Sequence, residues 1–133
     1  MPLHELPTLY DAYLNCLNTR NLAGLAELVA ENVEYNGTPM GLAGYRAMLE
    51  RDFEAIPDLA FRRVFLVTEP PNIACRLHFD CTPKGELFGL PVNGQRVQFT
   101  ENVFYAYERG KIRRVWSVID KAAIADQLGR STG

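Results

Sequence analysis

An aspartate ends the last strand-like segment of the chain, VWSVID at residues 115–120, directly before a helix-like stretch. Side chains of a strand alternate between its two faces, so a strand that buries Trp116 and Val118 turns Asp120 inward as well. A carboxyl group that faces an apolar cavity loses hydration, and its pKa rises toward neutral pH. Asp120 is therefore the first candidate for a general acid/base, and its alternative role is to cap the following helix.

A second acid, Glu101, lies in the strand-like segment 97–108 and also shares its face with apolar residues. Those neighbours are Val97, Phe99, Val103 and Tyr105. Burial of an acid without a partner is rare, which leaves two interpretations. In the first, Glu101 is a pocket carboxylate that orients substrate or raises the pKa of Asp120 by like-charge repulsion. In the second, it forms an ion pair with Arg76 or Arg114.

Further polar and aromatic residues are candidates for the wall of such a pocket. Arg76 and His78 share the polar face of the segment 72–82, which favours solvent or an interface. If that face is the inner one, His78 becomes a rival base, because a single bulge reverses the faces of a strand. Aromatic rings suit a flat, hydrophobic ligand. The aromatic candidates are Trp116, Phe88, Tyr13, Tyr35, Tyr45, Phe53 and Tyr105.

Metal-dependent and covalent chemistry have no motif in the sequence. The chain has two histidines, His4 and His78, which are too few for a zinc triad of histidines. It has no Gly-x-Ser-x-Gly elbow, no phosphate-binding loop and no dinucleotide-binding fingerprint. Cys16 falls on an apolar helix without a neighbouring base, and we interpret it as part of the core. We therefore expect a reaction that needs no metal and no cofactor.

The elements that must position these residues are three helices followed by a run of antiparallel strands. Apolar side chains recur every three or four residues in the helical segments 5–18, 22–29 and 41–56. Strands are predicted at 32–36, 61–67, 72–82, 97–108 and 112–120. Residues 83–95 are expected to form a loop or short hairpin, and a short helix spans 121–128. This order is typical of an α+β fold in which a curved sheet leaves a cavity against the helices.

Composition and charge fit one soluble, globular domain over residues 1–133. Apolar residues make up 47% and charged residues 23%, and the formal net charge is −2 with the basic residues scattered. We expect no nucleic-acid partner and no membrane span, because the chain has no basic patch and no apolar run of about 20 residues. The N-terminus lacks the pattern of a secretion signal. Three cysteines, two of them on one strand and far apart, give no disulfide framework, so we expect a cytoplasmic protein.

Over about 74–129 the chain resembles the SnoaL-like polyketide cyclase and ester cyclase family, which belongs to the nuclear transport factor two-like superfamily. The resemblance rests on the order and spacing of short motifs. These are Arg76, Thr82, Gly85-Glu86-Leu87-Phe88-Gly89, Asn93-Gly94, Gly110-Lys111-Ile112, Trp116, Asp120 and Gln127-Leu128-Gly129. Pro83 departs from the histidine that many members carry after the threonine. Residues 1–73 match more loosely, through Pro57-Asp58-Leu59 and the segment 35–41.

The resemblance implies a cone-shaped α+β fold, in which a curved mixed sheet wraps around the N-terminal helices and encloses a pocket. It also implies a cofactor-independent enzyme that acts on a hydrophobic, carbonyl-bearing small molecule by aldol-type cyclisation or a related isomerisation. In members that cyclise polyketides, the aspartate that matches Asp120 is the acid/base. The expected oligomer is a homodimer through the open face of the sheet.

Two other functions are compatible with the same fold, because fold does not determine function. The first is a non-catalytic module that binds a small ligand in the cavity. The second is an epoxide hydrolase or a ketosteroid-isomerase-like enzyme. The hydrolase needs two acids and an arginine around a water, and Asp120, Arg76 and Glu101 are the residues that could imitate this arrangement.

Overall fold

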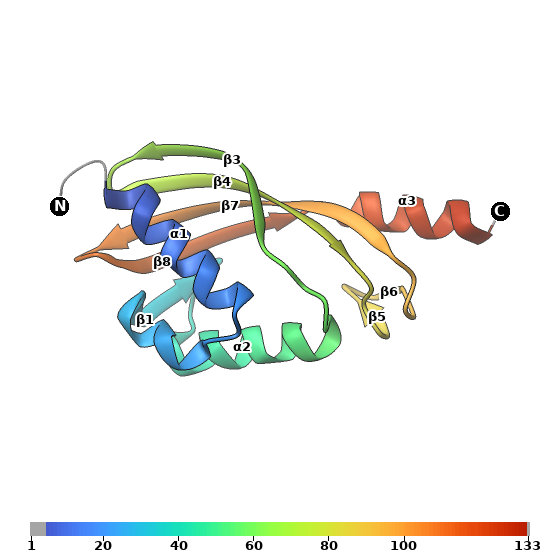
Figure 1. Ribbon diagram of the computed structural model, residues 1–133, viewed down its shortest axis with the longest axis horizontal. Coiled ribbons are helices and arrows are strands. Elements are labelled where there is room, and N and C mark those ends of the chain that lie inside the picture. The colour runs from blue at the N-terminus through green and yellow to red at the C-terminus, as the bar shows by residue number, and fades with distance from the viewer. Residues whose placement is uncertain (1–4, 133) are drawn as a thin grey trace.

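A six-stranded sheet curves over helices in the computed structural model of the protein, which describes residues 5–132 and, for 130–132, the backbone alone (Figure 1). The helices are α1 (Glu5–Asn18), the short 3-10 helix η1 (Leu22–Glu27), α2 (Gly41–Ala55) and α3 (Lys121–Thr132). The last of them, α3, extends away from the sheet toward the C-terminus (Figure 1). His4, one of the two histidines in the sequence, lies outside the described residues.

The sheet is mixed and has the strand order β2-β1-β8-β7-β4-β3. Its strands are β1 (Val29–Tyr35), β2 (Thr38–Pro39), β3 (Arg62–Glu69), β4 (Asn72–Cys81), β7 (Val97–Glu108) and β8 (Lys111–Ile119). Strands β1 and β8 are parallel, and the other neighbours are antiparallel. A small hairpin of β5 (Glu86–Leu87) and β6 (Leu90–Pro91) connects β4 to β7. The predicted α+β fold, with a curved mixed sheet around the N-terminal helices, is confirmed.

The largest difference from the predicted elements lies at 22–29, where the sequence predicts a regular helix. The structure has a 3-10 helix instead, and Asn21, which precedes it, makes no side-chain capping bond. The apolar residues Leu22, Leu25 and Leu28 are spaced by three, which is the period of a 3-10 helix rather than an α-helix. Spacing of three alone therefore did not distinguish the two helix types.

The sheet buries one face against α1 and α2. Strands β4 and β7 alternate between buried and exposed residues along their length. The buried residues of these strands are Ile73, Cys75, Leu77, Phe79, Cys81, Val97, Phe99, Val103, Tyr105 and Tyr107. Helices α1 and α2 contribute Leu6, Tyr10, Tyr13, Leu14, Leu17, Tyr45 and Leu49 to the same core. Cys16, Cys75 and Cys81 are buried free thiols, as expected for core residues.

A β-bulge at Arg113 decides which face of β8 turns inward. Ala106 of β7 pairs with Arg114. The next residue of β7, Tyr107, pairs with Ile112, which leaves Arg113 as one extra residue on β8. The buried Ile112 precedes this bulge, so the alternation that follows has the opposite parity.

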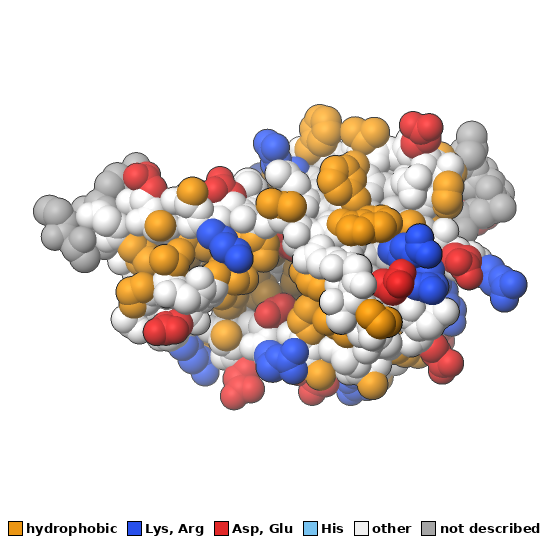
Figure 2. Space-filling model, turned by 180° about the vertical axis from the view of Figure 1, so that it is seen from behind, with side chains coloured by type: hydrophobic (Ala, Val, Ile, Leu, Met, Phe, Trp, Pro, Cys, Tyr) orange, Lys and Arg blue, Asp and Glu red, His pale blue; other side chains and the backbone are white. Residues whose placement is uncertain are grey.

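The bulge makes Val115, Ser117 and Ile119 the inner residues of β8. Trp116 and Val118 lie on the outer face, with exposed fractions of 41% and 68%. The expectation that Trp116 and Val118 are buried is therefore wrong, although the period of two is right. Hydrophobic side chains on the strand side of the molecule are visible along the upper part of Figure 2.

Candidate active site

Asp120 does not face a cavity. The residue is exposed and follows the outer residues of β8 in the alternation. Its Oδ1 accepts a hydrogen bond from the backbone N–H of Ala123 at 3.1 Å, which is the geometry of an N-cap for α3. The prediction that the Asp120 carboxyl projects into an apolar hollow is wrong, and the alternative role as a helix cap is the one observed.

An apolar cavity of about 260 Å³ lies between the inner face of the sheet, α2 and the β5–β6 hairpin. Its lining residues are Tyr35, Met48, Asp52, Ile56, Leu59, Phe61, Phe79, Leu87, Phe88, Phe99, Glu101 and Ile119. Four of the rings form a continuous row, with centroids 5.4 Å apart for Phe61 and Phe79, 5.1 Å for Phe79 and Phe99, and 6.4 Å for Phe99 and Phe88. Such a wall suits a flat ligand with delocalised electrons.

Glu101 on the inner face of β7 is one of two acids in this cavity. Its Oε2 accepts a hydrogen bond from the hydroxyl of Ser117 on the neighbouring strand β8. Burial raises the pKa of Glu101, the Ser117 bond lowers it, and the negative charge of Asp52 raises it further. Glu101 is therefore a poorly hydrated carboxyl group that faces a ligand-sized space.

The arginines that could have neutralised Glu101 lie elsewhere. Arg76 is exposed on the outer face of the sheet, where its Nε donates to Oδ1 of Asn102 at 2.9 Å. Arg114 pairs with Glu34 at 2.8 Å. The interpretation of Glu101 as an ion-paired structural acid is wrong, and so is the arrangement of Asp120, Arg76 and Glu101 around one water.

His78 lies on the same face of β4 as Arg76 and Asp80, away from the cavity. This agrees with the polar face predicted for the segment 72–82. Neither His78 nor Arg76 lines the cavity that holds Glu101. The role of His78 as a rival base therefore has no geometric support.

Asp52 of α2 is the second acid of the cavity, and the sequence interpretation missed it. Asp52 is an exposed residue, yet loss of hydration on the cavity side raises the pKa of its carboxyl group to about 6, and the charge of Arg51 opposes this rise. A signal was present in the sequence. Asp52 lies four residues after Met48 and four before Ile56, within the apolar stripe of the helix.

Tyr35 of β1 adds a hydroxyl group to the two acids. Burial raises the pKa of Tyr35, a hydrogen bond with Ser117 lowers it, and the charges of Glu101 and Asp52 raise it again. Its ring packs edge-on against Tyr45, with centroids 6.3 Å apart. Tyr35 thus lies near Ser117, whose hydroxyl donates to Glu101, at the wall of the cavity.

The other predicted pocket aromatics lie outside the cavity lining. Tyr13 and Tyr105 are buried in the core, where the Tyr13 hydroxyl lies 2.5 Å from that of Tyr45. The Tyr105 hydroxyl accepts a hydrogen bond from Tyr10 at 3.2 Å. Phe53 packs on Phe61 and under the guanidinium of Arg20, and Trp116 is on the outer face. Of the aromatic candidates, Tyr35 and Phe88 line the cavity.

Phe88 occupies a strained position at the tip of the β5–β6 hairpin. Its φ is 53° and that of Gly89 is 79°, the pattern of a two-residue type I′ turn. The turns Asn36-Gly37 and Asn93-Gly94 have similar φ pairs and carry the Asn-Gly sequence that such turns favour. A bulky side chain with positive φ costs roughly 1–2 kcal/mol, and this ring is also 42% exposed. Strain of this kind is typical of functional positions.

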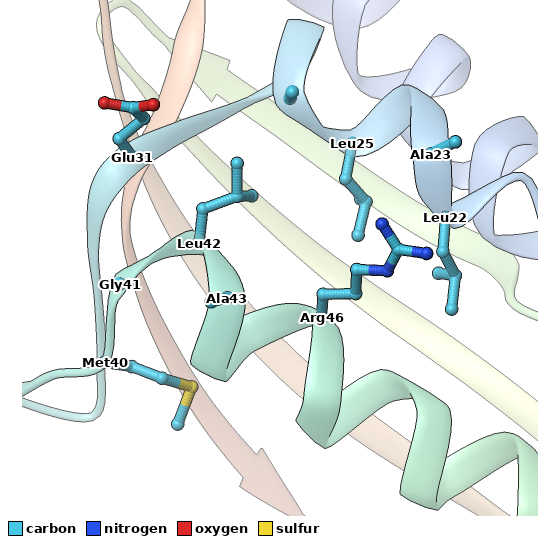
Figure 3. Close-up of a pocket in the computed structure, with 10 residues that line it drawn as sticks. Leu22, Ala23, Leu25, Glu31, Met40, Gly41, Leu42, Ala43 and Arg46 are labelled. Atoms are coloured by element: carbon cyan, nitrogen blue, oxygen red, sulfur yellow. The ribbon is translucent and has the colours of Figure 1, made fainter.

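A separate hollow of about 530 Å³ lies between η1 and the start of α2 (Figure 3). Glu31 and Arg46 lie on opposite sides of it, and Arg46 also pairs with Glu50 at 3.4 Å. The remaining lining residues are Leu22, Ala23, Leu25, Ala26, Met40, Gly41, Leu42 and Ala43. Because no two acid/base groups converge there, the cavity with Glu101 and Asp52 is the better candidate site.

Within residues 5–132, no three side chains of His, Cys, Asp or Glu are grouped closely enough to hold a metal ion. None of the helices in that range is both long and apolar enough to cross a bilayer.

Known proteins resemble this chain in sequence and in structure. A family model for the SnoaL-like polyketide cyclase matches residues 7–128. A SnoaL-like polyketide cyclase from Agrobacterium tumefaciens is 56% identical, with a TM-score of 0.89 over 90% of this chain and 94% of that chain. No protein of curated function matches.

More distant structures share the fold alone. IdmH from Streptomyces antibioticus is 21% identical, with a TM-score of 0.80 over 92% of this chain and 97% of that chain. TsrD from Streptomyces laurentii is also 21% identical, with a TM-score of 0.84 over 97% of this chain and 98% of that chain. With the family match over most of its length, the chain belongs to the SnoaL-like polyketide cyclase family, which has the nuclear transport factor two-like fold.

Proposed function

We propose that the protein is a cofactor-independent enzyme that transfers protons on a hydrophobic, carbonyl-bearing small molecule. The observation that carries the proposal is the pair of acids, Glu101 and Asp52, that line one apolar cavity. Among the described residues neither acid forms an ion pair. Poor hydration raises the pKa of both groups toward the range in which general acid/base catalysis works at neutral pH, and the charge of Asp52 raises the pKa of Glu101 further.

In this proposal Glu101 is the base. The Ser117 hydrogen bond favours the charged form of Glu101 and holds Oε2, which leaves Oε1 to accept a proton from the substrate. Asp52, with a pKa of about 6, is partly protonated near neutral pH and can donate a hydrogen bond. Tyr35 supplies a second O–H group at the same cavity wall.

The proposed reaction begins when Glu101 takes a proton from the carbon next to a carbonyl group. The electron pair of the broken C–H bond moves onto the carbonyl oxygen, where Tyr35 and protonated Asp52 stabilise the enolate. In an aldol-type cyclisation, the enolate carbon then forms a bond to a second carbonyl carbon of the same molecule. The resulting alkoxide takes the proton back, so that the enzyme returns to its first state. Return of the proton to a different carbon gives an isomerisation instead.

A non-catalytic binding module is the weaker alternative. Two acids with a raised pKa lower the stability of the folded protein at neutral pH, because the folded state disfavours their charged forms. Raised pKa values give no advantage to a protein that only binds a ligand, whereas a proton-transfer enzyme needs them. The paired acids therefore support the enzyme.

We also propose that two copies of the chain associate through the outer face of the sheet. Two cross-strand rows of side chains support this, Val67-Ala74-Phe104-Trp116 and Phe65-Arg76-Asn102-Val118. Phe65 and Phe104 have exposed fractions of 64% and 55%. Large apolar side chains exposed together on one face typically mark an interface, and an open sheet face can match a second copy of itself under two-fold symmetry.

The experiment that tests the enzyme proposal is solvent deuterium exchange into 2-tetralone, a two-ring ketone with acidic protons next to the carbonyl. We expect the protein to accelerate exchange, as followed by NMR, and Glu101→Gln to reduce the accelerated rate by about 10²–10⁴-fold. Asp120→Asn, which keeps a capping side chain outside the cavity, is the control and should keep the wild-type rate. Exchange no faster than in buffer, or equally fast in Glu101→Gln, would contradict the proposal.

A further inference from the structure

We infer that the mouth of the cavity binds an anionic group. The substrate is then a ketone of one or two rings, aromatic or enolisable, that also carries a carboxylate. The statement that the ketone end of this molecule reacts rests on the proposed function. The anion site itself is argued from a second hollow of about 420 Å³. This hollow shares Tyr35, Phe88 and Ile119 with the cavity, so the two spaces adjoin each other. Its other lining residues are Asn36, Ser117, Val118 and Lys121.

Lys121 provides a positive charge at this mouth. Its ammonium group lies 5.3 Å from the centroid of the Phe88 ring, within the range of a cation–π contact. None of the ion pairs among the described residues involves Lys121. The neighbouring carboxylate, Asp120, is turned to the N–H of Ala123. The ammonium group is therefore available to a ligand.

The Phe88 ring forms part of the wall of both spaces. It contacts Phe99 of the cavity edge-on at an interplanar angle of 87° and contacts Lys121 through its face. The ring is held there by a turn conformation that favours asparagine or glycine. An aromatic ligand that enters past Phe88 thus passes from a cationic rim to the row of rings inside.

The charges of the two spaces orient such a ligand. Glu101 and Asp52 in the cavity repel a carboxylate, and Lys121 is the one Lys, Arg or His among the residues that line either space. An anionic substituent is therefore stable at the mouth and unstable inside. A molecule with a carbonyl at one end and a carboxylate at the other binds in one direction, with the carbonyl toward Glu101.

The cavity volume limits the ring system. About 260 Å³ lies below the range of roughly 300–1,000 Å³ typical of pockets for drug-sized molecules. One or two fused rings fit this space, and the mouth accommodates the substituent. The geometry thus favours a small acidic ketone over a large uncharged polycycle.

The test compares the binding of 2-naphthol, which mimics the enol of 2-tetralone, with that of 6-hydroxy-2-naphthoate, which adds a carboxylate at the far end. We expect the wild-type protein to bind the naphthoate about two- to fivefold more tightly by fluorescence titration. Lys121→Met should abolish this preference without changing the Kd of 2-naphthol. Lys84→Met removes the same charge at an exposed residue that lines neither space, and it should keep the preference.

Salt provides a second measurement, because screening weakens a solvent-exposed ion pair. Raising NaCl from about 50 to about 500 mM should weaken binding of the naphthoate and leave 2-naphthol unchanged. A wild-type protein that binds neither probe, or that binds both equally, would overturn the inference, as would an unchanged preference in Lys121→Met. The Glu101→Gln variant should retain the preference. A wild-type protein that does not accelerate deuterium exchange but does show the preference for the naphthoate would refute the proposed enzyme and leave the anion site standing.

Discussion

Ser117 of β8 donates a hydrogen bond to Glu101 of β7, and the two residues meet diagonally across the strand pair because both face inward. Their meeting depends on the bulge at Arg113, which gives Ser117 rather than Trp116 the inner position. The bulge on β8 therefore affects the pKa of Glu101 on β7, because it places the Ser117 hydroxyl next to that carboxylate.

The hydroxyl of Ser117 should set the pH dependence of the proposed reaction. Its hydrogen bond lowers the pKa of Glu101, so Ser117→Ala should raise that pKa and move the acid limb of the rate profile to higher pH. The measurement is the rate of deuterium exchange into 2-tetralone as a function of pH. Ser117→Thr keeps the hydroxyl group and should keep the wild-type profile. Coincident profiles for the alanine and wild-type proteins would argue against this role.

Asp52→Asn should stabilise the protein at high pH and have little effect at low pH. The pKa of Asp52 is about 6 in the folded protein and 3.8 ordinarily, so the folded state binds a proton more tightly than the unfolded state. The resulting stability is complete below about pH 4 and is lost as pH rises through about 6. The measurement is the Tm of both proteins at pH 4 and pH 8 by thermal unfolding.

Glu54→Gln, at an exposed acid of the same helix that does not line the cavity, is the matched control for this prediction. It should show no comparable gain in Tm at pH 8. An Asp52→Asn protein that gains as much Tm at pH 4 as at pH 8 would mean that the effect does not come from ionisation of Asp52.

Asp120→Ala should destabilise the protein without affecting the cavity. The substitution removes the hydrogen bond to the N–H of Ala123 at the start of α3, and loss of an N-cap costs about 0.5–2 kcal/mol. Urea unfolding gives the change in the free energy of unfolding, and Asp120→Ser should recover most of it. Deuterium exchange per folded molecule should remain at the wild-type rate in both variants. A large loss of rate in the stable Asp120→Ser protein would restore Asp120 as an acid/base candidate.

Phe88→Asn should make the protein more stable and its ligand binding weaker. Asparagine accepts a φ of about 53° at lower cost than phenylalanine, so a gain of roughly 1 kcal/mol in the free energy of unfolding is expected. The loss of the ring should weaken 2-naphthol binding, since Phe88 ends the row of rings in the cavity. Equal affinity in the two proteins would show that the ring does not contact the ligand.

Phe104→Asp should convert the proposed dimer into a monomer, because it places a charge within the outer apolar row Val67-Ala74-Phe104-Trp116. The molar mass measured by light scattering during size-exclusion chromatography reports the change. Ala12→Asp adds the same charge at an exposed position on α1, which packs on the other side of the sheet, and should leave the dimer intact. A monomeric wild-type protein would contradict the proposed interface directly.

Much of the fold was predictable because its signals are local. Helix α1 and strand β7 have the predicted bounds, 5–18 and 97–108, since each has an uninterrupted apolar period between clear ends. The family resemblance through the motifs of 74–129 is likewise confirmed by the match to residues 7–128. Glu101 was recognisable as an acid on an apolar strand face, and that pattern needs no knowledge of the partner strand.

The composition of the site was decided by tertiary structure. Alternation along β8 predicts that Trp116 and Asp120 share a face, but one extra residue at Arg113 determines which face that is, and its position follows from pairing with β7. Whether Asp52 faces the cavity depends in the same way on how α2 packs against the sheet. The sequence by itself determined the elements and their periods, because these arise from neighbouring residues. Only the folded chain decided which carboxylates share a cavity, because that depends on the register and packing of segments far apart in sequence.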